Sequence, residues 1–289
     1  MSTALEQAQR AREPRLAPVP RVLVALPTVA APHGAVEAGG VIARALGAPL
    51  HGVLVWPTPI TPCQVARLLH VEPRVLEGMV LHVDVGDPAE RLDALIRAEP
   101  VAFLVLGAES HGCDLCGLGA SAARIVEATR ASAVVVRPGT SLGKLRRILV
   151  PLDGRPSTAE ALRPAADLAE RTSAALDLVM IEHAATPPSP EHGAMAPPRY
   201  VDQPQHEWPA FSAELVERFL GAFAHCAPWV PKRVFLGAGR PAREILRLAR
   251  ELDDDLIAMV WHGDRAGEHG EVFREVLADA ERPVLVLRR

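Results

Sequence analysis

Apolar residues gather along this chain in short runs, separated by longer segments in which they recur every three or four positions. The runs VLVAL and ILVPL are almost wholly apolar and rich in β-branched residues, which is typical of central strands. The segment STAEALRPAADLAERTSA has the period of an amphipathic helix. Because strands that alternate with helices of this length are joined by crossovers, the pattern predicts an α/β fold with an open, mainly parallel sheet and helices on both faces.

The whole pattern occurs twice. Three pairs of segments match, namely 21–28 with 147–154, 82–107 with 233–260, and 131–139 with 281–289. The offset is 126 residues at the first strand, 153 at the third and 150 at the last, so the second copy has gained 27 residues and later lost three. We expect two repeated five-stranded sheets, packed as an internal pseudo-dimer through their last strands, because an apolar sheet edge needs a partner.

The offsets and the composition also set the expected boundaries. Residues 1–18 are predicted to be a flexible tail, 19–140 the first repeat, 141–146 a linker and 147–289 the second repeat. The inserted segment, 184–210, holds seven prolines and so excludes a continuous helix. We expect a long surface loop there, either functional or disordered.

Charge and cysteine content narrow the classes of partner. The chain has 31 Lys and Arg against 35 Asp and Glu, scattered along its length, which does not favour nucleic-acid binding. No apolar run approaches the roughly 18 residues of a membrane span, and the first 20 residues lack the apolar core of a signal peptide. Four cysteines are too few for a secreted disulfide framework in 289 residues. We therefore expect a cytoplasmic protein with no membrane or nucleic-acid partner.

Two segments carry a family resemblance. ILVPLDGRPSTAEALRPAADLAERTSAALDLVMI resembles the opening strand, helix and second strand of the universal stress proteins, and GEVFREVLADAERPVLVLRR resembles their closing helix and strand. The resemblance runs from about Arg21 onward as a tandem pair. It implies a Rossmann-like fold of the adenine nucleotide alpha hydrolase-like kind, ATP binding in many members, and roles in stress survival and signalling.

The resemblance also implies a nucleotide signature. It consists of an Asp at the end of the first strand and, after a later strand, G-x-x-G, nine residues, and Gly followed by Ser or Thr. Helix N-termini at the carboxyl ends of parallel strands offer free N–H groups to phosphates, and glycine allows close backbone approach. An Asp at the first strand's end accepts hydrogen bonds from a base or a ribose.

The second repeat keeps one part of this signature. Asp153 is present and follows Pro151 at the end of the first strand. The remaining positions of the signature are held by Val260, Gly263, Gly270 and Glu271. A carboxylate at Glu271 complements the helix dipole itself and repels a triphosphate. The alternative interpretation of Asp153 is an ordinary turn acid that caps the helix beginning near Ser157.

The first repeat keeps the other part. Gly107 is present, Ser110 replaces the second glycine, nine residues follow, and Ala120 and Ser121 stand for the glycine and hydroxyl pair. Pro27 occupies the position of the acid. The alternative for Ser121 is a plain helix N-cap. Neither site is complete, so we expect degenerate sites for ATP or another adenine nucleotide in a non-catalytic binding or regulatory protein. Weak ATP hydrolysis, an unknown protein partner and a further homodimer are left open.

A second function class rests on the same scaffold. His111, Cys113 and Cys116 place three soft ligands at short spacing, which suits a zinc site or a redox pair, and Cys63 is a candidate fourth ligand. Two reduced thiols are the interpretation that we favour, so zinc is not expected.

The segment GAGRPA, residues 237–242, matches a dinucleotide-binding fingerprint. Its counterpart in the first repeat, VGDPAE, has a single glycine, Gly86. We therefore interpret both as a strand end followed by Pro at the first helical turn.

Overall fold

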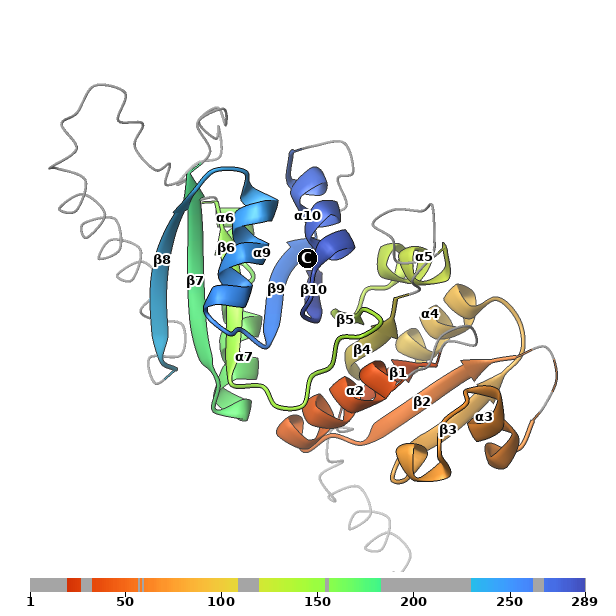
Figure 1. Ribbon diagram of the computed structural model, residues 1–289. Coiled ribbons are helices and arrows are strands. Elements are labelled where there is room, and N and C mark those ends of the chain that lie inside the picture. The colour runs from red at the N-terminus through yellow and green to blue at the C-terminus, as the bar shows by residue number, and fades with distance from the viewer. Residues whose placement is uncertain are drawn as a thin grey trace, which may run out of the picture.

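Ten strands form one continuous sheet (Figure 1). The computed structural model describes residues 20–26, 33–56, 58, 60–108, 120–153, 156–182, 230–261 and 268–288. The strand order is β3-β2-β1-β4-β5-β10-β9-β6-β7-β8, so each half of the sheet repeats the same order outward from the middle. The predicted α/β fold with two repeated, mainly parallel five-stranded sheets is confirmed.

The first repeat contributes five strands and their connecting helices. Its elements are β1 (Arg21–Ala25), α2 (His33–Leu46), β2 (Leu50–Val55), α3 (Pro62–Leu68), the 3-10 helix η1 (Pro73–Leu76), β3 (Val80–Asp84), α4 (Pro88–Ala98), β4 (Val101–Gly107), α5 (Ala120–Ala128) and β5 (Ala133–Val136).

The second repeat follows the same plan. Its elements are β6 (Arg147–Leu152), α6 (Pro156–Ala159), α7 (Leu162–Thr172), β7 (Ala175–Glu182), β8 (Lys232–Ala238), α9 (Pro241–Glu251), β9 (Leu256–Trp261), α10 (Glu268–Asp279) and β10 (Val284–Arg288). The prolines of the inserted segment lie outside the described residues.

The two repeats join through their last strands. β5 and β10 pair antiparallel, with Val135 opposite Val284 and Val134 opposite Leu285, whereas every other strand pair of the described sheet is parallel. All four residues of β5 are buried, and so are Val284 to Leu287 of β10. The expected internal pseudo-dimer through these strands is confirmed.

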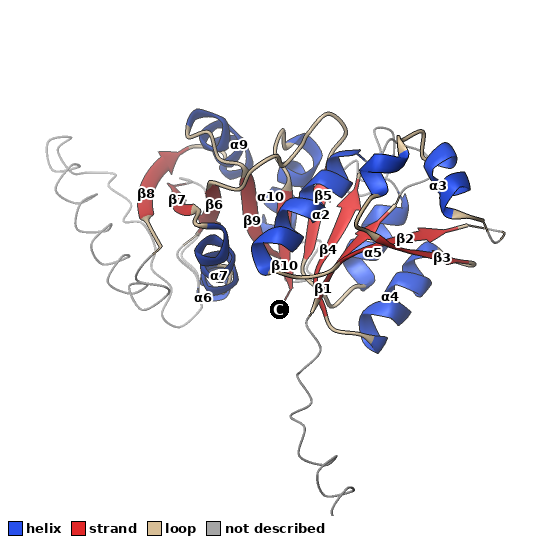
Figure 2. Cartoon of the chain, turned by 90° about the horizontal axis from the view of Figure 1, so that it is seen from below, coloured by secondary structure: helices blue, strands red, loops and turns tan. Residues whose placement is uncertain are grey.

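Helices cover both faces of the sheet (Figure 2). Residues of α2, α3 and α7 form one apolar core with one face, and residues of α4, α5, α9 and α10 form a second core with the other. Central strands are therefore buried on both sides, which explains why β1, β6 and β9 have almost no polar alternation. Within the part of the chain that the structure describes, no helix is both long enough and apolar enough to cross a bilayer.

Corresponding turns lead into α4 and α9. Gly86 has a φ of 132° and Gly239 a φ of 131°, a backbone conformation that side chains rarely adopt. Pro88 and Pro241 each begin the helix that follows. The interpretation of GAGRPA as a strand end followed by an initial proline is confirmed.

The residues that precede these prolines differ in charge. Asp87 caps α4, because its Oδ1 accepts hydrogen bonds from the N–H groups of Ala89 at 3.0 Å and Glu90 at 3.1 Å. The Glu90 N–H, followed by the Arg124 guanidinium, holds the pKa of Asp87 below its ordinary value. Arg240 takes the corresponding position before α9 and makes no side-chain capping bond.

We expect Asp87→Ala to lower the free energy of unfolding, because it removes the N-cap of α4 and the ion pair with Arg124. Arg240→Ala is the matched control, since no capping bond is lost there, and its effect should stay below roughly 0.5 kcal/mol. Chemical denaturation of both variants at pH 7 measures the difference. Equal effects would show that the Asp87 cap adds nothing to stability.

Candidate functional site

The sheet has two places where the strand order reverses, between β1 and β4 in the first repeat and between β6 and β9 in the second. In open α/β sheets, ligands bind in the crevice beyond the carboxyl ends of the strands at such a point. The two copies therefore define two related candidate sites. Among the described residues of the nucleotide signature, Gly107, Asp153 and Val260 lie at or next to these carboxyl ends.

Asp153 directly follows β6 at the second of these points and is half-buried. The hydroxyl of Thr158 in α6 donates to Asp153 Oδ1 at 2.5 Å, and the Asp153 N–H lies 3.5 Å from Thr158 Oγ1. This pair closes the turn between β6 and α6 and orients the carboxylate. The turn-acid interpretation and a ligand-binding role both fit this geometry.

The N-terminus of α10 lies beyond the neighbouring strand, β9. Trp261 ends β9 and stacks on Phe273 of α10, with ring centroids 4.6 Å apart, which anchors the helix to the strand. Gly270 is buried within the first turn of α10. Val260 is half-buried near the end of β9. Gly263 lies outside the described residues.

Glu271 is the fourth residue of α10, within its first turn. Its Oε1 lies 3.6 Å from Nη2 of Arg240, which is also 3.5 Å from Oε2 of Glu275. The Glu271 side chain is 65% exposed. The carboxylate that we expected to complement the helix dipole is thus also partly neutralised by an arginine at the start of α9.

Fewer of the predicted residues of the first repeat belong to the part of the chain that the structure describes. Gly107 ends β4 opposite Val136 of β5. Ser121 is the second residue of α5, so it lies inside the helix rather than at the cap position that we weighed as its alternative. Ser110 and Pro27 lie outside the described residues.

The proposed zinc or redox ligands His111, Cys113 and Cys116 also lie outside the described residues. Cys63 is described, is exposed and lies on α3. Within the described ranges, no group of three or more His, Cys, Asp or Glu side chains is arranged to hold a metal ion.

A buried charge cluster, which the sequence analysis missed, lies at the amino ends of β6 to β9. Asp177 on β7 is fully buried and accepts two hydrogen bonds from Arg233 of β8, one of them from Nε at 2.7 Å. Arg147, the first residue of β6, lies 3.6 Å from the same carboxylate. Asp254 is also fully buried beside them. A lone Asp within the apolar strand sequence ALDLVMIE was the available signal.

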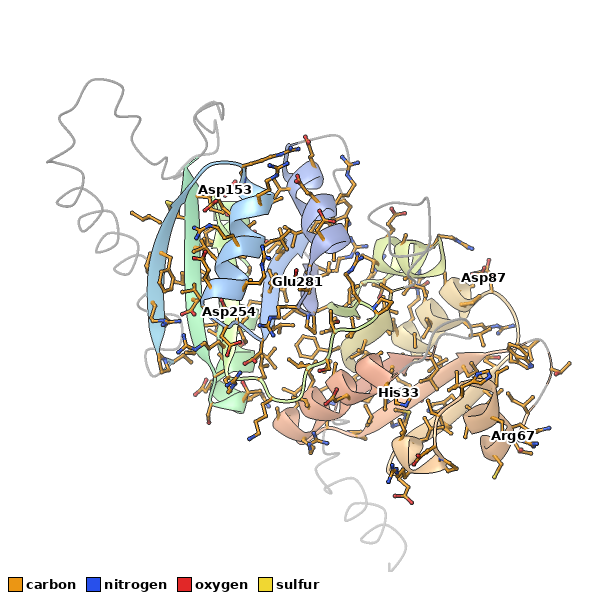
Figure 3. The ribbon with its side chains drawn as sticks, viewed as in Figure 1. His33, Arg67, Asp87, Asp153, Asp254 and Glu281 are labelled. Atoms are coloured by element: carbon orange, nitrogen blue, oxygen red, sulfur yellow. The ribbon has the colours of Figure 1, made fainter. Side chains whose placement is uncertain are left out.

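Asp254 has an abnormal titration. Neither of its carboxyl oxygens has a hydrogen-bond partner at ordinary distances among the described residues. Burial raises the pKa of Asp254 to about 8, with a further contribution from the charge of Asp177, against the opposing effect of Arg147 and Arg233. Asp254 is therefore protonated at neutral pH. Figure 3 shows Asp254 and Asp153 at opposite ends of the second repeat, so this cluster is separate from the crevice.

The first repeat carries a different cluster at the matching place. The strand registers Leu23–His51 and Leu149–Asp177 make His51 the counterpart of Asp177. His51 Nδ1 lies 2.7 Å from Nε2 of His82, and the two rings stack. Burial, followed by the charges of Arg21 and His82, lowers the pKa of His51. Each repeat thus buries polar groups under the amino ends of its strands, with different chemistry.

We expect Asp254→Asn to remove a pH dependence of stability. The folded protein keeps this proton up to about pH 8, whereas the unfolded chain releases it near the ordinary pKa of 3.8. Because the folded state binds more protons between these values, stability falls as the pH rises, by up to about 1.4 kcal/mol per pH unit. The variant should therefore gain stability over the native protein progressively from pH 5 to pH 8.

Chemical denaturation of both proteins across that range measures the difference. Asp253→Asn, which changes an exposed neighbouring carboxylate, is the control. Parallel stability profiles for Asp254→Asn and the native protein would contradict the assignment of a buried proton to Asp254.

Known structures match this architecture along nearly the whole chain. A universal stress protein from Archaeoglobus fulgidus DSM 4304 is similar with 15% sequence identity and a TM-score of 0.60, covering 92% of this chain and 96% of that one. A functionally unknown protein from Pseudomonas aeruginosa PAO1 is similar with 15% identity and a TM-score of 0.62, covering 93% and 92%. At this identity, the likeness shows the fold.

The sequence itself gives the family. The model of the universal stress protein family matches residues 144–288, which is just over half of the chain and includes every described element of the second repeat. The order of strands and helices in the first repeat is the same as in the second. The chain therefore belongs to the universal stress protein family.

Proposed function

We propose that this protein is a non-catalytic, regulatory binding protein of the universal stress type that holds an adenine nucleotide at the carboxyl ends of β6 and β9. The observation that carries the proposal is the position of Asp153. Its half-buried carboxylate directly follows β6 at a point where the strand order reverses. An acceptor at that point suits the amino group of a base or the hydroxyls of a ribose.

The neighbouring groups suit the other end of a nucleotide. The first turn of α10 contains the buried Gly270, whose lack of a side chain lets a phosphate approach the backbone. Arg240 adds a cation 3.6 Å from Glu271 at the same turn. The phosphates of the nucleotide would compete with Glu271 and Glu275 for this arginine, which makes the site weaker than one with a hydroxyl at position 271.

Support for a binding role rather than a catalytic one comes from the same residues. Asp153 is hydrogen-bonded to Thr158 in a turn, and Glu271 is ion-paired. A nucleotide bound here would act by changing the surface that the protein offers to a partner.

We expect Asp153→Asn to weaken ATP binding by about tenfold or more, because a charged hydrogen-bond acceptor is lost. The measurement begins with the adenine nucleotide released from freshly purified, undialysed protein. Calorimetric titration of the emptied protein with ATP then gives the dissociation constant. Asp167→Asn is the matched control, since Asp167 is an exposed acid on α7. Absence of nucleotide and of ATP binding in the native protein would refute the proposed function.

We expect Glu271→Ser to strengthen ATP binding by about two- to fivefold, because it removes a negative charge from the N-terminus of α10 and leaves Arg240 with one carboxylate fewer. The gain should shrink at high salt, which screens exposed charges. Glu281→Ser is the control, because Glu281 is an exposed acid beyond the other end of α10. An unchanged dissociation constant for Glu271→Ser would disprove repulsion by Glu271.

A further inference from the structure

We propose that the pair of His51 and His82 is a pH-sensitive latch, which fastens the edge strand β3 to β2 at neutral pH and releases it in weak acid. His51 is the second residue of β2, so the latch lies near the amino end of that strand. The candidate crevice lies at the carboxyl ends of the strands. The latch therefore does not depend on the proposed nucleotide site.

The strand β3 has little buried surface of its own. Among the described strands it pairs with β2 alone, and it lies at the outer edge of the first repeat (Figure 1). None of its five residues is buried, and Val80 is 50% exposed, whereas β2 has four buried residues. A strand with few buried apolar contacts opens at a lower free energy than the core. A single polar contact therefore weighs more in its attachment.

The two histidines join β3 to β2 on the face of the sheet that α4 covers. Leu23 is the ladder partner of His51, and Val53 is the ladder partner of His82. Both apolar partners belong to the core that α4 shares, and partners in a ladder share a face. His51 is only 9% exposed, and its Nδ1 lies 2.7 Å from Nε2 of His82. The side chains therefore form a direct bridge between the two strands.

Arg21 determines which nitrogen of the pair carries the proton. Its Nη1 lies 3.4 Å from Nδ1 of His51, and its ion pair with Glu99 holds the guanidinium in this place. A guanidinium can only donate, so Nδ1 of His51 is an acceptor and Nε2 of His82 is the donor. A proton on Nδ1 of His51 would face the N–H groups of both neighbours. Protonation of His51 at this atom therefore breaks the bridge.

The charges around the pair do not favour a second cation. Charged groups on the elements packed around it are Arg21 of β1, Asp84 of β3, and Asp87, Glu90, Arg91, Asp93, Arg97 and Glu99 on or beside α4. Within the described residues, the His51 side chain makes hydrogen-bond contacts with Arg21 and His82 and with no carboxylate. A positive charge on His51 would thus be placed beside an arginine.

The sign of the pH dependence follows from His51. Burial, followed by the charges of Arg21 and His82, lowers the pKa of His51 from its ordinary value of 6.5. When β3 opens, His51 loses His82 and gains water, so its pKa returns toward that value. Below about pH 6.5 the open form then binds more protons than the closed form, and falling pH favours opening. The junction of β5 with β10 is separated from β3 by β2, β1 and β4, so the change stays at the outer edge.

Hydrogen exchange followed by mass spectrometry tests the latch in the full chain, with each rate divided by the intrinsic rate at the same pH. We expect the protection of the β3 amides to fall by about three- to tenfold per pH unit between pH 6.5 and pH 5. Free carboxylates titrate mostly below this range. The other edge strand, β8, is the internal reference. Its protection should not fall, because the protonated Asp254 stabilises the second repeat at lower pH.

His51→Gln should abolish the pH dependence of protection in β3. Glutamine still offers an acceptor to Arg21 and His82 but does not titrate. His33→Gln, at an exposed histidine on α2, is the matched control and should keep the native slope. Slopes with pH are compared, so a change in the overall stability of a variant does not affect the test. A flat native profile, an equal fall in β8, or a fall that persists in His51→Gln would each overturn the proposal.

Discussion

The antiparallel pairing of β5 with β10 is the contact on which the rest of this structure depends. It converts two five-stranded sheets into one sheet of ten and removes two apolar edges that would otherwise invite association. Two arginines reinforce it across the repeat boundary. Arg137 donates to the carbonyl of Leu277 near the end of α10, and Arg288 donates to the carbonyls of Glu127 and Thr129 at the end of α5. Each repeat thus supplies a cation to the C-terminal end of the other's helix, where the dipole favours it.

The two repeats have ion pairs at corresponding places, but the acidic and basic members of each pair are exchanged between the helices. Asp87 pairs with Arg124 between α4 and α5, whereas Arg240 pairs with Glu271 and Glu275 between α9 and α10. At the amino ends of the strands, a histidine pair occupies the place of an aspartate and arginine cluster. The packing of helix on helix and strand on strand requires matched partners at these places rather than particular residues.

Most of the fold, but less of the candidate site, could be predicted from the sequence. Apolar runs and their offsets predicted the repeats and the β5–β10 junction. They could do so because a strand that is buried on both faces of a sheet consists almost wholly of apolar residues. The nucleotide signature singled out Asp153 and Gly270, whose role in binding stays a prediction. The Asp254 cluster was not, since Arg147, Asp177, Arg233 and Asp254 come together only through the strand order. The cap alternative for Ser121 was wrong because α5 begins one residue before it, and helix ends depend on backbone bonds that composition does not specify.

The unequal halves fit a division of tasks within one chain. Without the first repeat, β10 would present an apolar edge, and Arg288 would lose its carbonyl partners on α5. The first repeat therefore stabilises the second through this edge, whatever either crevice binds. A change in the second repeat at β9 would reach the first repeat through β10 and β5, because these strands are neighbours in one sheet.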